Sequence, residues 1–230
     1  MLIELAAVTH SYGDRTVLED VTLRADDRRI GVIGANGSGK STFARLLDAL
    51  VVPSSGTVRI DGLDTARDAR AIRRRVGFCF TDPDAQIVMP TVAEDVAFGL
   101  RRLKLTKSEV HQRVAAALER AGLGDHADHP AHQLSGGQKQ LLALTSVLVT
   151  EPDLLVLDEP TTLLDLRNTR RVAGVVAELP QQVVLVTHDV ELLDGFDRVL
   201  VFDQARLVAD GPPAEAVTFY RHLMAREPAP

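Results

Sequence analysis

The residues from Gly34 to Ser41 have the types and the spacing needed to bind a chain of phosphates. They read Gly-Ala-Asn-Gly-Ser-Gly-Lys-Ser and fit the pattern G-x-x-x-x-G-K-[ST]. Glycines let such a loop curl until successive backbone N–H groups point at one anion. The alternative is an ordinary glycine-rich turn, but every fixed position of the pattern is filled. The loop therefore predicts a site for a nucleoside triphosphate.

Both flanks of this loop agree with the prediction. Residues 29–33 predict a short buried strand, and residues 42–47 predict the first turns of a helix. The positive end of that helix dipole would face the phosphates. Lys40 is placed to reach the β- and γ-phosphates, and Ser41 to hold Mg²⁺. The predicted nucleotide-binding residues of the loop are Gly34, Asn36, Gly37, Ser38, Gly39, Lys40, Ser41 and Thr42.

Two adjacent carboxylates, Asp158 and Glu159, form a second candidate group. They follow the apolar residues 154–157, which predict a buried strand. In open α/β sheets ligands bind at the carboxyl ends of such strands. Asp158 fits a Mg²⁺ ligand, directly or through water, and Glu159 fits the base that orients and deprotonates an attacking water. A strand that merely ends in acids is the alternative, but beside a phosphate loop the pair indicates hydrolysis.

Ser135, Gly136, Gly137 and Gln138 make a third pattern, at the start of an apolar helix. A serine that opens a helix, followed by glycines, exposes a hydroxyl and N–H groups at the positive end of a dipole. Taken alone, the pattern predicts either an anion site or an ordinary helix cap.

The elements that must position these groups predict an α/β fold. Residues 1–10 and 16–24 alternate as antiparallel strands around a turn. Residues 154–157 and 183–186 are wholly apolar, as buried parallel strands are. A crossover helix between them is expected to end at Pro180. We expect these elements to form the core of the fold.

The middle of the chain changes to a helical pattern. Thr106 and Glu109 make a capping box, followed by apolar residues at helical spacing. We expect a single domain over residues 1–225, with an inserted helical subdomain at about 84–150 and a frayed tail at 226–230.

Composition narrows the classes of function. The chain has 230 residues and a net charge of −6, which does not suggest a nucleic-acid binder. A single cysteine excludes an internal disulfide and suits a reducing compartment. No run approaches about 18 apolar residues, and no signal-peptide pattern opens the chain. We therefore expect any membrane role to act through a partner.

Taken in order, the motifs resemble those of ABC-type ATPases over nearly the whole chain. The order is the phosphate loop, Leu-Ser-Gly-Gly-Gln at 134–138, Leu-Leu-Val-Leu-Asp-Glu-Pro-Thr at 154–161, and a lone His188 after a strand. The resemblance implies a P-loop NTPase core with a mixed sheet, an antiparallel β-subdomain and an inserted α-helical subdomain. It implies ATP and Mg²⁺ as ligands. It also implies two subunits packed head to tail, with each ATP between one phosphate loop and the other subunit's signature, 135–138.

The same resemblance assigns further roles. Tyr12 matches the aromatic residue that stacks on adenine, His188 the residue that contacts the γ-phosphate, and Asp165 the loop that crosses the dimer interface. The implied catalytic residues are Lys40, Glu159 and His188, and the implied metal ligands are Ser41 and Asp158.

One position departs from the family pattern. Thr81 stands where a glutamine usually contacts Mg²⁺ and senses the transmembrane partner. Thr81 has an oxygen but a shorter reach, so either water fills the gap, or Gln86 or Asp82 substitutes. The departure bears on metal geometry and coupling, not on nucleotide binding.

Residues 82–99 resemble the Asn-Pro-Asp-x-Gln, Pro-Thr-Val and Glu-Asp-Val-Ala-Phe-Gly patterns of energy-coupling factor transporters, which import vitamins and transition-metal ions. The resemblance implies a transmembrane coupling protein and a substrate-capturing membrane protein as partners, at the cytoplasmic face of the membrane.

The chain is compact like the ATPases of biotin modules, so biotin is the expected substrate, with cobalt or nickel next. Intact motifs favour a homodimer. Apolar candidates for the coupling groove, or for packing inside the helical region, are Ile87, Val88, Met89, Val92 and Phe98.

Two other functions fit the ATPase motifs. One is a non-transport ABC ATPase that acts on ribosomes or nucleic acid, against which the negative net charge argues. The other is the ATPase of an importer fed by a binding protein, against which the resemblance of residues 82–99 argues.

Overall fold

The structure is a computed structural model that describes residues 1–225. It comprises two compact units. The first consists of Met1–Val76, Asp153–Glu159 and the described part of Pro180–Pro230, and the second of Gly77–Pro152 and Pro160–Leu179. The predicted helical insertion, 84–150, lies inside the second unit, whereas the predicted frayed tail, 226–230, lies outside the described residues.

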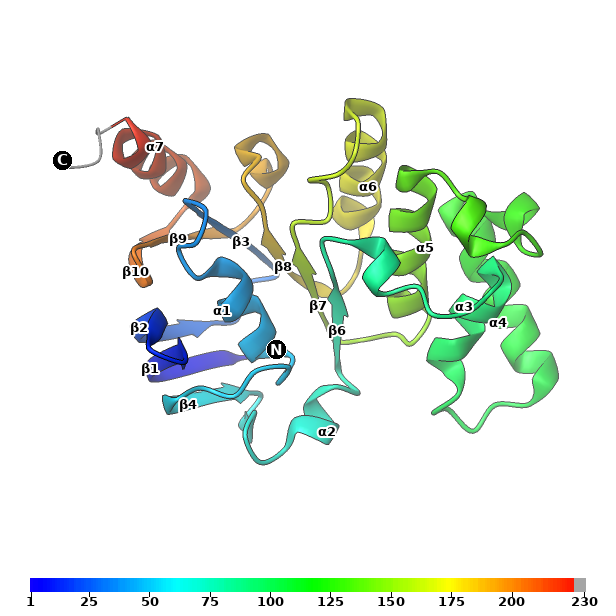
Figure 1. Ribbon diagram of the computed structural model, residues 1–230, viewed down its shortest axis with the longest axis horizontal. Coiled ribbons are helices and arrows are strands. Elements are labelled where there is room, and N and C mark those ends of the chain that lie inside the picture. Colours follow the sequence, from blue (N-terminus) through cyan, green and yellow to red (C-terminus); the bar gives the residue numbers. More distant parts are fainter. Residues whose placement is uncertain (226–230) are drawn as a thin grey trace. The chain divides into compact units, whose positions relative to one another are not determined.

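An antiparallel sheet opens the first unit, with the strand order β2-β1-β4-β5 (Figure 1). Its strands are β1 (Ile3–Tyr12), β2 (Arg15–Ala25), β4 (Ser55–Ile60) and β5 (Leu63–Asp64). The predicted hairpin of β1 and β2 is confirmed and closes with Tyr12 opposite Arg15. Gly13, in the turn, has a φ of 59°, a conformation that glycine adopts without steric cost.

The second sheet of this unit carries the core, with neighbouring strands in the order β10-β9-β3-β8-β7. These strands are β3 (Arg29–Gly34), β7 (Leu154–Asp158), β8 (Gln182–Val186), β9 (Arg198–Asp203) and β10 (Arg206–Gly211). β3 pairs in parallel with β8 and β9. β7 and β8 also pair in parallel, which confirms the prediction of parallel strands at residues 154–157 and 183–186. Every residue of β3, β7 and β8 is buried, which explains their nearly continuous apolar sequences.

Helices complete the first unit. They are α1 (Lys40–Leu47), α2 (Ala69–Ile72), the short η4 (Val190–Leu193) and α7 (Pro213–Met224), the last of which packs on β9 and β10 (Figure 1). Across residues 1–225, no helix combines the length and the apolar character that crossing a bilayer requires.

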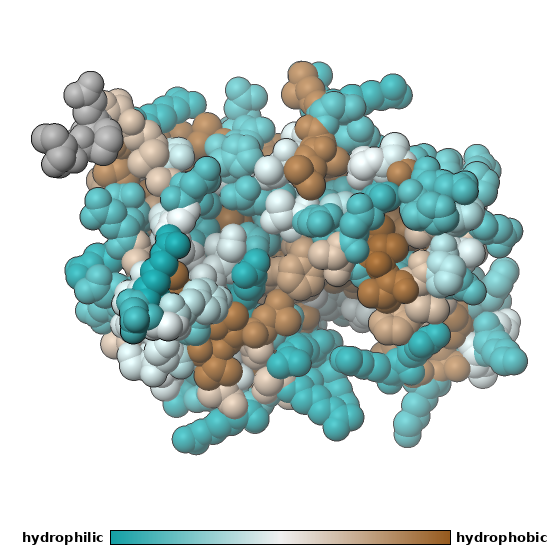
Figure 2. All heavy atoms as spheres, viewed as in Figure 1, coloured by the Kyte–Doolittle hydropathy of each residue, from teal (hydrophilic) through white to brown (hydrophobic). Residues whose placement is uncertain are grey.

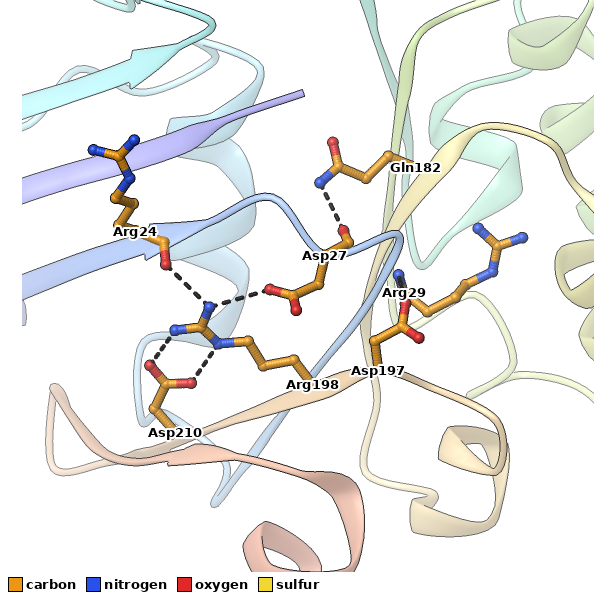
Figure 3. Close-up of polar contacts among 7 residues, drawn as sticks. All are labelled: Arg24, Asp27, Arg29, Gln182, Asp197, Arg198 and Asp210. Atoms are coloured by element: carbon orange, nitrogen blue, oxygen red, sulfur yellow. Dashed lines mark hydrogen bonds and ion pairs between the residues drawn. The ribbon is translucent and has the colours of Figure 1, made fainter.

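Arg198, at the start of β9, joins the two sheets of the first unit (Figure 3). Its guanidinium donates two hydrogen bonds of 2.6 Å to Asp210 on β10, and others to Asp27 and to the carbonyl of Arg24. The bonds to Asp210 are the main reason that the pKa of Arg198 is raised. Because Arg24 lies on β2 and Asp27 follows it, one side chain fixes the antiparallel sheet to the core sheet.

The second unit is mainly helical. All of β6 (Val76–Cys79) except its first residue belongs to this unit. Its α-helices are α3 (Val92–Leu100), α4 (Lys107–Ala121), α5 (Gly136–Leu148) and α6 (Leu166–Glu178). Its short 3-10 helices are η1 (Pro83–Ala85), η2 (Gly124–His126) and η3 (Ala131–Gln133). The predicted capping box of Thr106 and Glu109 is confirmed at the start of α4. α3, α4 and α5 pack on one another.

Of the two alternatives for Val92, the coupling groove and packing inside the helical region, the structure supports packing. Val92 is 0% exposed, because it begins α3 on the same helix face as Val96 and Leu100, which are also buried. Spacing of four residues puts these side chains in one stripe toward the other helices. Val88 and Phe98, by contrast, are 61% and 44% exposed.

Asp48, the C-cap residue of α1, gives a test of how the phosphate-loop helix is stabilised. Its side chain is buried, its Oδ1 lacks a hydrogen-bond partner in the described structure, and burial raises its pKa to about 7. A raised carboxyl pKa means that the neutral form stabilises the fold, and that this stability is lost as pH rises from about 4 through about 7. Asp48→Asn should therefore be more stable than the wild type at pH 8 by about 1–4 kcal/mol.

The measurement is urea unfolding at several pH values. The advantage of Asp48→Asn should shrink as the pH falls toward about 4. Asp26→Asn, which removes the same charge from an exposed position, is the control. An advantage that does not change with pH would contradict the explanation.

Candidate nucleotide-hydrolysis site

The phosphate loop connects β3 to α1 through glycines in conformations that other residues rarely adopt. Gly34, Gly37 and Gly39 have φ values of 154°, 78° and 105°. A Cβ on Gly34 would collide with the carbonyl oxygen of Phe202 on β9. The glycine at this position therefore lets the loop lie directly against the sheet.

A serine hydroxyl of the loop fits a bound phosphate. The Oγ of Ser38 is buried and has no hydrogen-bond partner in the described structure, which a phosphate oxygen would supply. Asn36 and Gly37 are exposed at the tip of the loop, while Thr42 is buried in the first turn of α1. The loop thus presents both a buried and an open side to a ligand.

Lys40 lies across the loop. Its Nζ donates hydrogen bonds of 2.9 Å to the carbonyls of Gly34 and Ala35, and the side chain is only 5% exposed. Burial lowers the pKa of Lys40, although the carboxylates of Glu159 and Asp158 raise it. A buried cation held over an anion-binding loop is suited to contact phosphate oxygens.

Ser41 and Asp158 form a pair of oxygen ligands. The Oγ of Ser41 donates a hydrogen bond of 2.9 Å to Oδ1 of Asp158, which ends β7 and is 1% exposed. Burial raises the pKa of Asp158, and the bond from Ser41 opposes that rise. A hydroxyl beside a carboxylate is a donor set that fits Mg²⁺.

Glu159 and His188 lie at the same edge of the sheet, because β7 and β8 are in register with Asp158 opposite Val186. The N–H of Glu159 bonds to the carbonyl of Val186, and Nδ1 of His188 lies 3.4 Å from Oε2 of Glu159. Glu159 has a φ of 52°, a strained conformation for a residue with a side chain. The turn after each strand thus brings the predicted base and the predicted histidine together.

Tyr12 ends β1 and is 49% exposed. Its ring meets the ring of His10 edge to face, with centroids 4.7 Å apart. An exposed aromatic face of this kind is available for stacking on a base.

The second unit brings the predicted signature and the predicted interface loop together. Ser135, Gln138 and Asp165 line one cavity of 440 Å³, along with Arg167, Asn168 and Arg171. Ser135 caps α5 in a capping box with Gln138, and Asp165 caps α6. Sequence reasoning missed the last three residues of this lining, since their nearness to Ser135 depends on how α5 and α6 pack.

The glycines of the signature differ in their surroundings. Within the described residues 1–225, a Cβ on Gly136 would meet nothing within 4 Å, whereas one on Gly137 would collide with the side chain of Asn168. Gly137 thus serves packing inside the unit, and Gly136 stays open to a ligand.

Thr81 belongs to the second unit, and its part in metal binding stays a prediction. Of its alternatives, Gln86 accepts a hydrogen bond from the N–H of Phe80 and donates one to the carbonyl of Ala143. Asp82 caps η1. Both side chains would have to leave contacts within their own unit to bind a metal.

Comparison with known proteins places the chain in a family. The ABC transporter family model matches residues 18–162, and the chain belongs to this family. The ATP-binding members of the family are ATPases, so the chain binds and hydrolyses ATP.

Several relatives match over most of their length. A putative ABC transporter ATP-binding protein of Deinococcus radiodurans is 57% identical over 97% of this chain and 99% of its own. The biotin transport ATP-binding protein BioM of Rhizobium etli is 49% identical over 98% of this chain and 100% of its own. The energy-coupling factor transporter ATP-binding protein EcfA1 of Caldanaerobacter subterraneus is 42% identical over 86% of this chain and 74% of its own.

Solved structures agree with the fold. CbiO1 of Clostridium perfringens, part of the ABC transporter complex CbiONQ, superposes with a TM-score of 0.83 at 31% identity, over 96% of this chain and 92% of its own. The dimeric ATP-binding cassette MJ0796, bound to ADP and Pi, superposes with a TM-score of 0.82 at 27% identity, over 92% of this chain and 98% of its own.

The role of Glu159 can be tested by Glu159→Gln. The amide keeps the size of the side chain but cannot accept a proton from water, so turnover should fall at least about 100-fold while ATP binding remains. Steady-state hydrolysis and nucleotide titration measure the two effects. Glu191→Gln, at an exposed position beyond His188, should change neither. Full hydrolysis by Glu159→Gln would contradict the role of Glu159 as the base.

Proposed function

We propose that this chain is the ATP-hydrolysing subunit of an energy-coupling factor importer of a vitamin or metal ion, with biotin as the substrate of that importer. The observation that carries the proposal is the similarity, over almost the entire length, to a biotin transport ATP-binding protein. The resemblance of residues 82–99 to energy-coupling factor ATPases supports the same class independently of substrate.

The proposed reaction uses residues of the first unit for the chemistry. Lys40 and the loop N–H groups hold the phosphates, Glu159 accepts a proton from the attacking water, and His188 steadies the γ-phosphate. Magnesium, held by Ser41 and Asp158, would neutralise phosphate charge. The catalytic contribution of the chain is thus mainly positioning and charge stabilisation.

We further propose a head-to-tail homodimer, in which Ser135 and Gly136 of one subunit complete the ATP site of the other. The dimeric form of MJ0796 supports two subunits. The openness of Gly136 supports a ligand at the signature, because a Cβ built there meets nothing within 4 Å among residues 1–225.

Mixing two inactive variants tests this arrangement. Lys40→Ala removes the phosphate-loop cation, and Gly136→Glu puts a carboxylate where a phosphate would bind, at a position with room for it. Each homodimer should be inactive. In a mixed dimer, however, one of the two sites combines the intact Lys40 of the Gly136→Glu subunit with the intact Gly136 of the Lys40→Ala subunit. Refolded together in equal amounts, the variants should recover about a quarter of the wild-type activity.

Gly174→Glu is the matched control, since a Cβ there also meets nothing within 4 Å. It should be active alone. A mixture that stays as inactive as its two components would contradict sites shared between subunits.

The proposed contact with the membrane partner lies on the second unit. Val88 and Phe98 are exposed there, and Figure 2 shows hydrophobic surface over the region of α3 and α5. Exposed apolar side chains of this kind suit the helices of a coupling protein. The subunit would then sit at the cytoplasmic face of the membrane, held by its partners.

Affinity purification from detergent-solubilised membranes of the native cells tests the proposal. The tagged chain should co-purify with two integral membrane proteins, one of which binds biotin. Val88→Glu should lose both, because it places a charge in the apolar contact. Val208→Glu, at an exposed apolar position of the first unit, should keep them. Ribosomal proteins in place of membrane proteins would contradict the transport function but not the ATPase activity.

A further inference from the structure

The end of the β1–β2 hairpin places a cation beside the tyrosine expected to stack on adenine. Arg15 is the direct cross-strand partner of Tyr12. Residues opposite each other in an antiparallel pair project from the same face, with Cβ atoms about 5 Å apart. The aromatic ring and the guanidinium therefore leave the hairpin on one side.

That side of the hairpin contacts the phosphate loop. A Cβ built on Gly37 would lie 3.5 Å from Nη2 of Arg15. One built on Gly39 would lie 2.8 Å from Cδ2 of Leu18, the cross-strand partner of His10. Arg15 thus lies against the exposed tip of the loop and is the cross-strand neighbour of the proposed adenine platform, Tyr12.

The charge of Arg15 is available to a ligand. The side chain is exposed, and no carboxylate pairs with it within residues 1–225. Arg24, on the same strand, instead lies 3.4 Å from the carboxylate of Glu4. The platform beside Arg15 is held in place, since Tyr12 packs edge to face on His10, which is 7% exposed.

We propose that Arg15 binds the phosphate chain of ATP from the side of the phosphate loop that faces the adenine. Its guanidinium would donate charge-assisted hydrogen bonds to phosphate oxygens while Tyr12 stacks on the base. Tyr12 and Arg15 then act as one clamp that selects an adenine nucleotide over free phosphate and over adenosine. The inference rests on ATP as the ligand of the loop, and not on which transporter the chain powers.

Binding of ADP, ATP and adenosine to the full chain tests the clamp, with a fluorescent ADP analogue as the probe and the three ligands as competitors. Arg15→Gln should weaken ADP and ATP by roughly tenfold and leave adenosine almost unchanged. Arg15→Lys should recover part of the loss, because it restores the charge but not the planar fork. Arg24→Gln, with the same change of charge on the same strand, should bind all three ligands as the wild type does.

Equal affinities of Arg15→Gln and Arg24→Gln for ADP would overturn the proposal. So would an equal loss for adenosine and ADP, which would mean that Arg15 acts only by supporting Tyr12. Tyr12→Ala is the reference for loss of stacking, since it should weaken the binding of ADP, ATP and adenosine alike. Loss of ADP binding in Lys40→Ala verifies that the probe occupies the phosphate loop, so failure of the clamp and failure of the ATP site give different results.

Discussion

The burial of Asp158 beside Ser41 is the constraint on which the catalytic geometry depends. A carboxylate that is 1% exposed is costly to ionise unless donors or cations surround it. Here the hydroxyl of Ser41 donates to it, and the N-terminus of α1 brings positive dipole charge to the same place. The hydrogen bond fixes the first turn of α1 to the end of β7. It thereby sets where the phosphate loop and Lys40 lie relative to Glu159.

Close contact with the sheet explains the backbone of the site. Gly34 has no room for a side chain, since the carbonyl of Phe202 occupies that space. Glu159 tolerates a positive φ because its N–H is held by the carbonyl of Val186 on the neighbouring strand. Both unusual conformations occur where strands end at the carboxyl edge of the sheet. The surrounding strands therefore stabilise strain at the residues that would meet the phosphates.

The sequence predicted those features that local patterns encode. The phosphate loop, the paired carboxylates, the β1–β2 hairpin and the capping box of α4 all follow from residues close together in the chain. Features set by packing were harder to predict. The inward direction of Val92 depends on which face of α3 meets the other helices, and the contact of Asn168 with Gly137 joins segments far apart in sequence. Arg15 could have been found, because a hairpin closing at Gly13 makes it the partner of Tyr12.

The functional residues that the sequence predicted are distributed between the two units. The first unit carries the loop, both carboxylates and His188, and the second carries the signature and Asp165. Within the signature, Gly137 is packed against Asn168 while Ser135 and Gly136 are exposed. Gly137 fixes the backbone by packing on Asn168. Ser135 and Gly136 keep their hydroxyl and N–H groups at the surface, at the start of α5. An exposed helix start of this kind is suited to an anion, and we infer that this is why the motif combines a rigid glycine with an open one.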